Sequence, residues 1–110
     1  MTTVLIKDEY AELLSTFGDL QTAIDVALQR YTIEQVTAKV AELRHRDGAY
    51  QAKYGLDYPT FAQRIAKDQN FVNKIESEID KTWELDLTDW EFCYKGIEDW
   101  THKLQNILLT

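Results

Sequence analysis

The sequence predicts a mainly α-helical fold that opens with one short β-strand. Only one proline and four glycines occur in 110 residues, so few positions interrupt a helix. Apolar side chains recur at three- and four-residue spacing along most of the chain, which is typical of amphipathic helices. The exception is Thr3–Ile6, an apolar and partly β-branched run that is too short for a helix and has the composition of a strand.

Two short helices are expected after this strand. The first begins at Asp8 and ends before Gly18. Its apolar face holds Tyr10, Leu13, Leu14 and Phe17. Asp19 is a good N-cap for the second helix. The apolar face of that helix holds Leu20, Ala23, Ile24, Ala27, Leu28 and Tyr31.

A single strand leaves both of its edges unpaired within one chain. The economical solution is a second copy that donates a matching strand, so the sequence predicts a homodimer. The residues assigned to dimerisation are Val4, Leu5, Ile6, Leu13, Ile24 and Leu28.

The second helix reads A-I-D-V-A-L-Q-R-Y over Ala23–Tyr31. Together with the preceding strand, helix and Gly-Asp break, residues 2–31 resemble the ribbon-helix-helix fold of small prokaryotic DNA-binding proteins and antitoxins. The resemblance implies a ribbon-helix-helix dimerisation module over residues 1–31. The outward-facing Leu5 offers no hydrogen bond to a base, so the ribbon is expected to dimerise rather than read DNA. DNA contact remains an alternative, through Thr2, Thr3 and Lys7.

The charge of the chain also opposes DNA binding. Twelve basic and 19 acidic residues give a net charge of −7, and phosphate repels such a chain. Residues up to Arg46 carry five basic and seven acidic side chains, and the remainder carry seven and twelve. The acidic C-terminal half suits a basic protein surface, although an ordinary solvated surface can carry the same charge.

A long connecting helix is expected over residues 32–55. Thr32 and Gln35 form a capping box at its start, and Gly55 is suited to its end. Its apolar positions form a heptad-like seam that either pairs two chains or packs within one. The seam holds Ile33, Val36, Val40, Leu43, Tyr50 and Tyr54.

Short helices are predicted for the rest of the chain, residues 56–110. Pro59 suits the first turn of a new helix, and a further amphipathic run covers residues 71–79. Thr88 and Glu91 form a second capping box, which predicts the start of the last helix.

Residues 53–61, K-Y-G-L-D-Y-P-T-F, and the pair Trp90-Glu91 are similar to elements in the second half of small prokaryotic antitoxins. This similarity implies an arm that orders against a toxin. Aromatic residues concentrate after Arg46, and Trp and Tyr dominate interface hot spots. The residues assigned to partner binding are Phe61, Trp83, Trp90, Phe92, Tyr94 and Trp100. Burial of the same rings in the chain's own core is the equal alternative, although Phe92 falls away from the Trp90–Tyr94 stripe.

No catalytic, metal or cofactor site is predicted. Cys93 and His102 would lie roughly 13 Å apart along one helix, too far to act as nucleophile and base. The histidines and the cysteine show none of the zinc-site spacings. The start of the chain lacks the pattern of a signal peptide, no apolar stretch is long enough to span a membrane, and one cysteine fits a reducing cytosol.

The expected function is therefore that of a cytoplasmic antitoxin. It would dimerise through its N-terminal ribbon and occlude a small, basic cognate toxin with its acidic, aromatic C-terminal helices, with autoregulation at its operator as a further expectation. The alternative is a homodimeric helical scaffold that binds neither toxin nor DNA.

Overall fold

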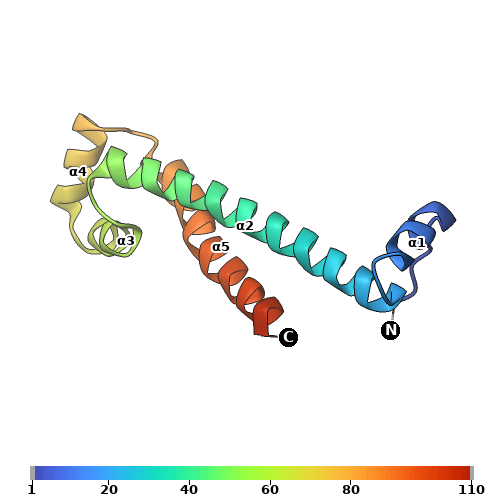
Figure 1. The fold of residues 1–110 in the computed structure, drawn as a ribbon. Helices are drawn as coiled ribbons and strands as arrows, with labels where there is room; N and C mark the ends of the chain where they lie inside the picture. Colours follow the sequence, from blue (N-terminus) through green and yellow to red (C-terminus); the bar gives the residue numbers. More distant parts are fainter. Residues whose placement is uncertain (1, 110) are drawn as a thin grey trace. The chain divides into compact units, whose positions relative to one another are not determined.

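The computed structural model describes residues 2–109, which form five α-helices (Figure 1). They are α1 (Asp8–Ser15), α2 (Leu20–Tyr54), α3 (Tyr58–Lys67), α4 (Gln69–Glu78) and α5 (Trp83–Leu109). The mainly α-helical prediction is confirmed. The chain divides into two compact units between Gln35 and Val36, called here the N-terminal and the C-terminal unit.

The predicted N-terminal strand is wrong, and the ribbon-helix-helix fold falls with it. No strand occurs among residues 2–109, and Thr3–Ile6 has no regular secondary structure. Val4 and Leu5 are 74% and 96% exposed. A strand is stabilised by hydrogen bonds to a neighbouring strand, and no described segment of the chain supplies one.

The two short N-terminal helices begin where the sequence predicts, but the second does not stop at Tyr31. Gly18, at φ 136°, makes the break that follows α1, and the backbone N–H of Thr22 donates to Asp19 Oδ2 at 3.1 Å. The helix then continues for 35 residues, through the expected capping box at Thr32. Nothing near Thr32 breaks a helix, so its backbone N–H is satisfied by the preceding turn.

Aspartate caps set the start of both short helices in the C-terminal unit. Gly55, at φ 73°, ends α2 as predicted. Asp57 Oδ1 accepts from the backbone N–H of Thr60 at 3.0 Å, and Asp68 Oδ1 accepts from that of Phe71 at 3.1 Å. These caps allow α3 and α4 to follow one another with a single residue between them.

The last helix starts earlier than predicted, at Trp83. The Thr88 hydroxyl lies inside α5 and donates to the carbonyl oxygen of Glu84 at 3.1 Å, so it does not cap the helix. The extra turn brings Trp83 and Asp86 onto the same helix as Trp90.

An aromatic cluster forms the core of the C-terminal unit. Phe61 and Trp90 are fully buried, and their ring centroids lie 5.3 Å apart. Tyr54 stacks on Trp90 at 5.8 Å, which joins the end of α2 to the middle of α5. The complete buried cluster is Tyr54, Phe61, Phe71, Ile75, Trp83 and Trp90. These contacts hold α3 and α4 beside the C-terminal end of α2 (Figure 1).

Candidate interaction surface

The N-terminal unit exposes its apolar side chains. None of residues 2–35 is buried. Phe17 is 83% exposed and Leu28 is 60% exposed. The described chain therefore leaves an apolar surface of this unit uncovered. An eight-residue helix such as α1 is also marginal in water unless it packs against another element. Its large exposed side chains are Val4, Leu5, Ile6, Tyr10, Leu13, Phe17, Val26, Leu28 and Tyr31.

A groove of about 600 Å³ runs along this unit between α1, the turn at Gly18 and the first half of α2. The large apolar groups in its lining include Leu14, Phe17 and Tyr31. Along α2, the groove is lined by Thr22, Ala23, Val26, Ala27, Arg30, Tyr31 and Glu34. Ala23 and Ala27 leave the helix backbone open to close approach by another element.

Residues 1–35 carry six acidic and only two basic residues. Asp19 and Arg30 both line the groove. Asp19 Oδ2 accepts from the backbone and the hydroxyl of Thr22, both at 3.1 Å. The Arg30 guanidinium forms no ion pair or hydrogen bond with any residue of 2–109, so its charge is available to a partner.

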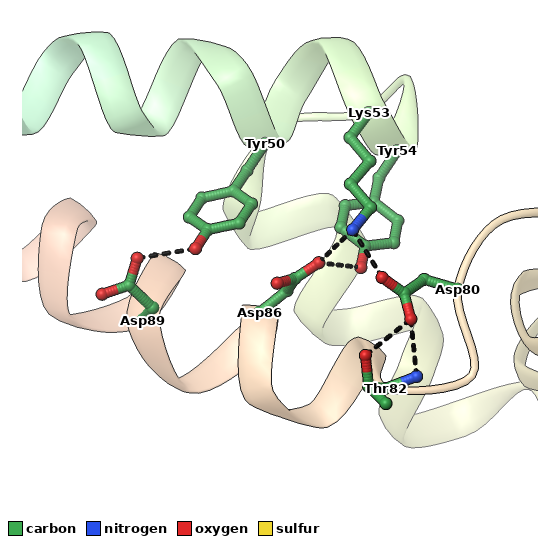
Figure 2. Close-up of polar contacts among 7 residues, drawn as sticks. All are labelled: Tyr50, Lys53, Tyr54, Asp80, Thr82, Asp86 and Asp89. Atoms are coloured by element: carbon green, nitrogen blue, oxygen red, sulfur yellow. Dashed lines mark hydrogen bonds and ion pairs between the residues drawn. The ribbon is translucent and has the colours of Figure 1, made fainter.

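A group of hydrogen-bonded titratable side chains lies in the C-terminal unit, between α2 and α5 (Figure 2). The Tyr50 hydroxyl donates to Asp89 Oδ2 at 2.6 Å. Lys53 Nζ donates to Asp86 Oδ2 at 2.6 Å, and the Tyr54 hydroxyl donates to the same oxygen at 2.6 Å. We call these contacts the polar seam, together with the contacts of Asp80, Asp47 and Arg46 described in the next paragraph.

Further contacts complete the polar seam. Lys53 Nζ also donates to Asp80 Oδ2 at 2.6 Å, and the hydroxyl and backbone N–H of Thr82 donate to Asp80 Oδ1 (Figure 2). Trp90 Nε1 donates to Asp47 Oδ1 at 2.7 Å. Arg46 pairs with Asp89. No buried side-chain nitrogen or oxygen in residues 2–109 lacks a hydrogen-bond partner. The polar seam is therefore closed, meaning that its buried polar atoms are all paired within the chain.

The pKa shifts of Tyr50, Lys53 and Asp80 in the polar seam favour the ordinary protonation states of these three groups. Burial and the hydrogen bond to Asp89 raise the pKa of Tyr50 to about 12. Hydrogen bonds to Asp80 and Asp86 raise the pKa of Lys53, and the Lys53 ammonium holds the pKa of Asp80 well below its usual range. Neutral tyrosines and a charged lysine are what hydrogen-bond donation to carboxylates requires, so the seam serves to hold α5 on α2.

The Cys93 thiol is buried beside this seam, and burial raises its pKa, with the nearby Asp89 adding to the effect. A thiolate is therefore disfavoured at this position. His102 lies on the exposed side of α5, 3.9 Å from Glu98 Oε1.

The structure divides the residues that the sequence assigns to partner binding. Phe61, Trp83 and Trp90 lie in the aromatic core. In this conformation their rings face inward, and the chain's own helices occupy the surface that a partner would use. Tyr94 is partly exposed and packs on Tyr58 at 4.9 Å, and Trp100 is half-buried with Lys103 Nζ 4.3 Å from its ring centroid. Phe92, which lies off the Trp90 stripe, is 59% exposed.

The residues assigned to dimerisation all lie in the N-terminal unit, and most of them are exposed. Ile24 is half-buried, and the others are exposed: Val4, Leu5, Ile6, Leu13 and Leu28. The candidate DNA contacts Thr2, Thr3 and Lys7 are also exposed and precede α1.

Sequence reasoning missed the acidic partners of the polar seam. Asp47, Asp86 and Asp89 were not identified as hydrogen-bond partners of residues on α2. The available signal was that Arg46, Tyr50 and Lys53 recur at three- and four-residue spacing on α2, which places three hydrogen-bond donors on one face. Sequence reasoning also missed Arg30 as the one basic residue among those that line the groove.

Comparisons with protein-family models, with characterised proteins and with solved structures found no match to this chain. Within residues 2–109, no helix combines the length and the apolar character that crossing a membrane requires. The same residues contain no cluster of three or more side chains placed to hold a metal ion.

Proposed function

We propose that this chain is a cytoplasmic, non-enzymatic interaction protein that forms a homodimer through its N-terminal unit. The observation that carries the proposal is the contrast between the two units. The C-terminal unit has a buried aromatic core and a closed polar seam, whereas none of residues 2–35 is buried. An exposed apolar surface of this extent is typical of an interface.

The exposed area is of the size that a dimer needs. Tyr10, Phe17 and Tyr31 are 55%, 83% and 62% exposed. An aromatic side chain buries about 150–250 Å², so these three rings offer roughly 400 Å² per copy. A stable interface buries about 800 Å² per partner, and the exposed aliphatic side chains of the same unit can supply the rest.

Two phenylalanines test this proposal as a matched pair. Phe17→Ser removes an exposed ring from the N-terminal unit and should turn the dimer into a monomer, whereas Phe92→Ser removes an exposed ring from the C-terminal unit and should leave a dimer. Sedimentation equilibrium over a concentration series gives the mass, and circular dichroism checks that both variants keep their helix content. A wild-type chain that stays monomeric at every concentration overturns the proposal.

Neutralisation of a small basic toxin is a second candidate function, and it is the one that the resemblance of residues 53–61 implies. The observation that favours it is that the exposed Leu85 and Phe92 lie seven positions apart on α5, each directly after a glutamate, Glu84 and Glu91. Apolar groups among carboxylates are complementary to a basic apolar surface. DNA contact through the residues before α1 stays a prediction.

The toxin proposal is tested by capture from a native lysate with the same pair of variants. The wild-type chain should retain a small basic protein in comparable amount, and the Phe17→Ser variant should retain it as well. The Phe92→Ser variant should lose it while remaining a dimer. Equal recovery by the Phe92→Ser variant, or no such protein with the wild type, contradicts neutralisation through α5.

A further inference from the structure

We propose that the two copies pair their α2 helices in antiparallel orientation along the groove, with Arg30 of each copy bound to Asp19 of the other. This inference rests on the proposed dimerisation through the N-terminal unit and adds its orientation and its charge contacts. Three features of the groove carry it: the small residues on α2, the positions of its charges and the absence of an ion-pair partner for Arg30.

The small residues provide the place where two helices can approach closely. Thr22, Ala23, Val26 and Ala27 line the groove on α2 and lie within two turns of each other. Packed helices lie about 8–10 Å apart, depending on the side chains between them, and the shorter distances need small residues at the crossing. The exposed rings of Phe17 and Tyr31 stand at the edges of this stretch and can pack around an incoming helix.

The charges lie at the two ends of the same stretch. Asp19 and Arg30 are eleven positions apart, which is close to three helical turns, so they occupy one face about 16 Å apart. The midpoint between them falls between Ile24 and Asp25, within the part of α2 that carries the alanines.

This arrangement selects the orientation of the pair. In a parallel pairing each residue meets its own copy, so Arg30 would face Arg30 and Glu34 would face Glu34. In an antiparallel pairing about a twofold axis at the midpoint, Arg30 meets Asp19 and Asp19 meets Arg30, so opposite charges meet twice. Asp19 caps α2 through Oδ2 and retains Oδ1 for the second copy.

Charge complementarity also identifies a second copy as the occupant of the groove. The lining includes one cation and two carboxylates, Arg30, Asp19 and Glu34. A uniformly basic partner would place a positive charge against Arg30, and an acidic partner would meet the carboxylates. A second copy brings one charge of each sign to the required end.

Two matched aspartates test the contact by a change of the same charge. Asp19→Asn removes the proposed partner of Arg30 but keeps the helix cap, since Asn caps about as well as Asp. Asp25→Asn makes the same change at a residue outside the groove lining, whose Oδ1 accepts from Gln21 at 3.0 Å. In low salt, sedimentation equilibrium should show the dimer dissociation constant rising about 3- to 10-fold for Asp19→Asn, the range expected for two lost surface ion pairs, and changing less than about twofold for Asp25→Asn.

A charge exchange between chains supplies the decisive measurement. Arg30→Asp and Asp19→Arg should each dimerise at least about tenfold more weakly than the wild type, because like charges then meet twice. Mixed in equal amounts, the two variants should form a heterodimer, in which both contacts are again of opposite sign. A different mass tag on each chain makes the heterodimer visible by native mass spectrometry.

The outcomes separate this inference from the proposal on which it rests. A wild-type chain without any dimer overturns the proposed homodimer. If the wild type is a dimer, three results would each overturn the antiparallel α2 pairing and leave the homodimer standing. They are an unchanged dissociation constant for Arg30→Asp, equal behaviour of Asp19→Asn and Asp25→Asn, and no heterodimer from the mixed variants.

Discussion

At the scale of single residues, Gly96 shows how closely α2 and α5 approach in the C-terminal unit. A Cβ built on Gly96 would lie 2.8 Å from Leu43 Cδ1, and Leu43 is fully buried. Gly48 is also in a helix, but a Cβ there would meet nothing within 4 Å. The two glycines therefore separate the effect of helix propensity from the effect of packing.

We predict that Gly48→Ala stabilises the chain and that Gly96→Ala does not. Alanine is better than glycine in a helix by about 1 kcal/mol, so Gly48→Ala should stabilise the chain by about 0.5–1 kcal/mol. Gly96→Ala gains the same propensity but overpacks the crossing at a cost of about 1–3 kcal/mol, so it should be neutral to destabilising by about 2 kcal/mol. Urea unfolding measures both, and equal stabilisation by the two substitutions would refute the close crossing.

Single residues were predictable where the signal is local to the backbone. Asp19 and Gly55 have the roles that the sequence predicts, because an N-cap and a left-handed helix end depend on few neighbours. Thr32 and Thr88 match the capping-box pattern equally well, yet both lie inside helices. A hydroxyl in a helix interior is satisfied by the carbonyl oxygen of the preceding turn, as it is at Thr88, so the pattern alone does not locate a helix start.

At the scale of elements, the predicted strand was wrong, whereas the segments predicted to be helical are helical. Thr3–Ile6 has the composition of a strand, but strand formation depends on a neighbour that this chain does not contain among its described residues. The backbone hydrogen bonds of a helix form within one segment of the chain, so the periodicity of its apolar residues predicts the helix without knowledge of tertiary contacts. The uninterrupted length of α2 was missed because the capping-box pattern of Thr32 and Gln35 was taken for the start of a new helix.

The polar seam shows what an element-level prediction omits. The face of α2 that carries Tyr50 and Tyr54 was identified as a packed seam, although its partner was left open between a second chain and the chain itself. The structure gives α5 as the partner. Which acidic helix lies opposite depends on the turns at Gly55 and after α4, and these long-range pairings leave no periodic signal in the sequence.

At the scale of the whole molecule, the buried rings show how far the site could be predicted. Helix α5 was expected to be apolar on two sides, and its two sides have different environments: Trp90 lies in the core and Phe92 is exposed. The apolar periodicity identified both residues as contact-making, but only the pairing of helices decides which ring is covered by the chain itself. In the N-terminal unit no such pairing covers Phe17, which is why this unit carries the proposed interface.

The titratable groups of the C-terminal unit predict a stability profile that declines at both ends of the pH range. Asp80, whose pKa is lowered mainly by Lys53, contributes stability that is present above its unfolded-state pKa near 4 and is lost as the pH falls towards its lower folded-state value. Tyr50, whose pKa is raised to about 12, contributes stability that is present below about pH 10 and is lost between about pH 10 and 12. Raising the pKa of Lys53 adds to the alkaline loss.

The urea midpoint should therefore be nearly constant between about pH 5 and 9 and fall outside this range. Asp80→Asn should lower the midpoint at neutral pH and flatten the acidic limb, since the amide cannot titrate and pairs less strongly with Lys53. Tyr50→Phe should flatten the alkaline limb and leave the acidic one unchanged. An acidic limb as steep in Asp80→Asn as in the wild type would show that Asp80 does not hold the seam together, because the remaining carboxylates would then account for all of the proton uptake on unfolding.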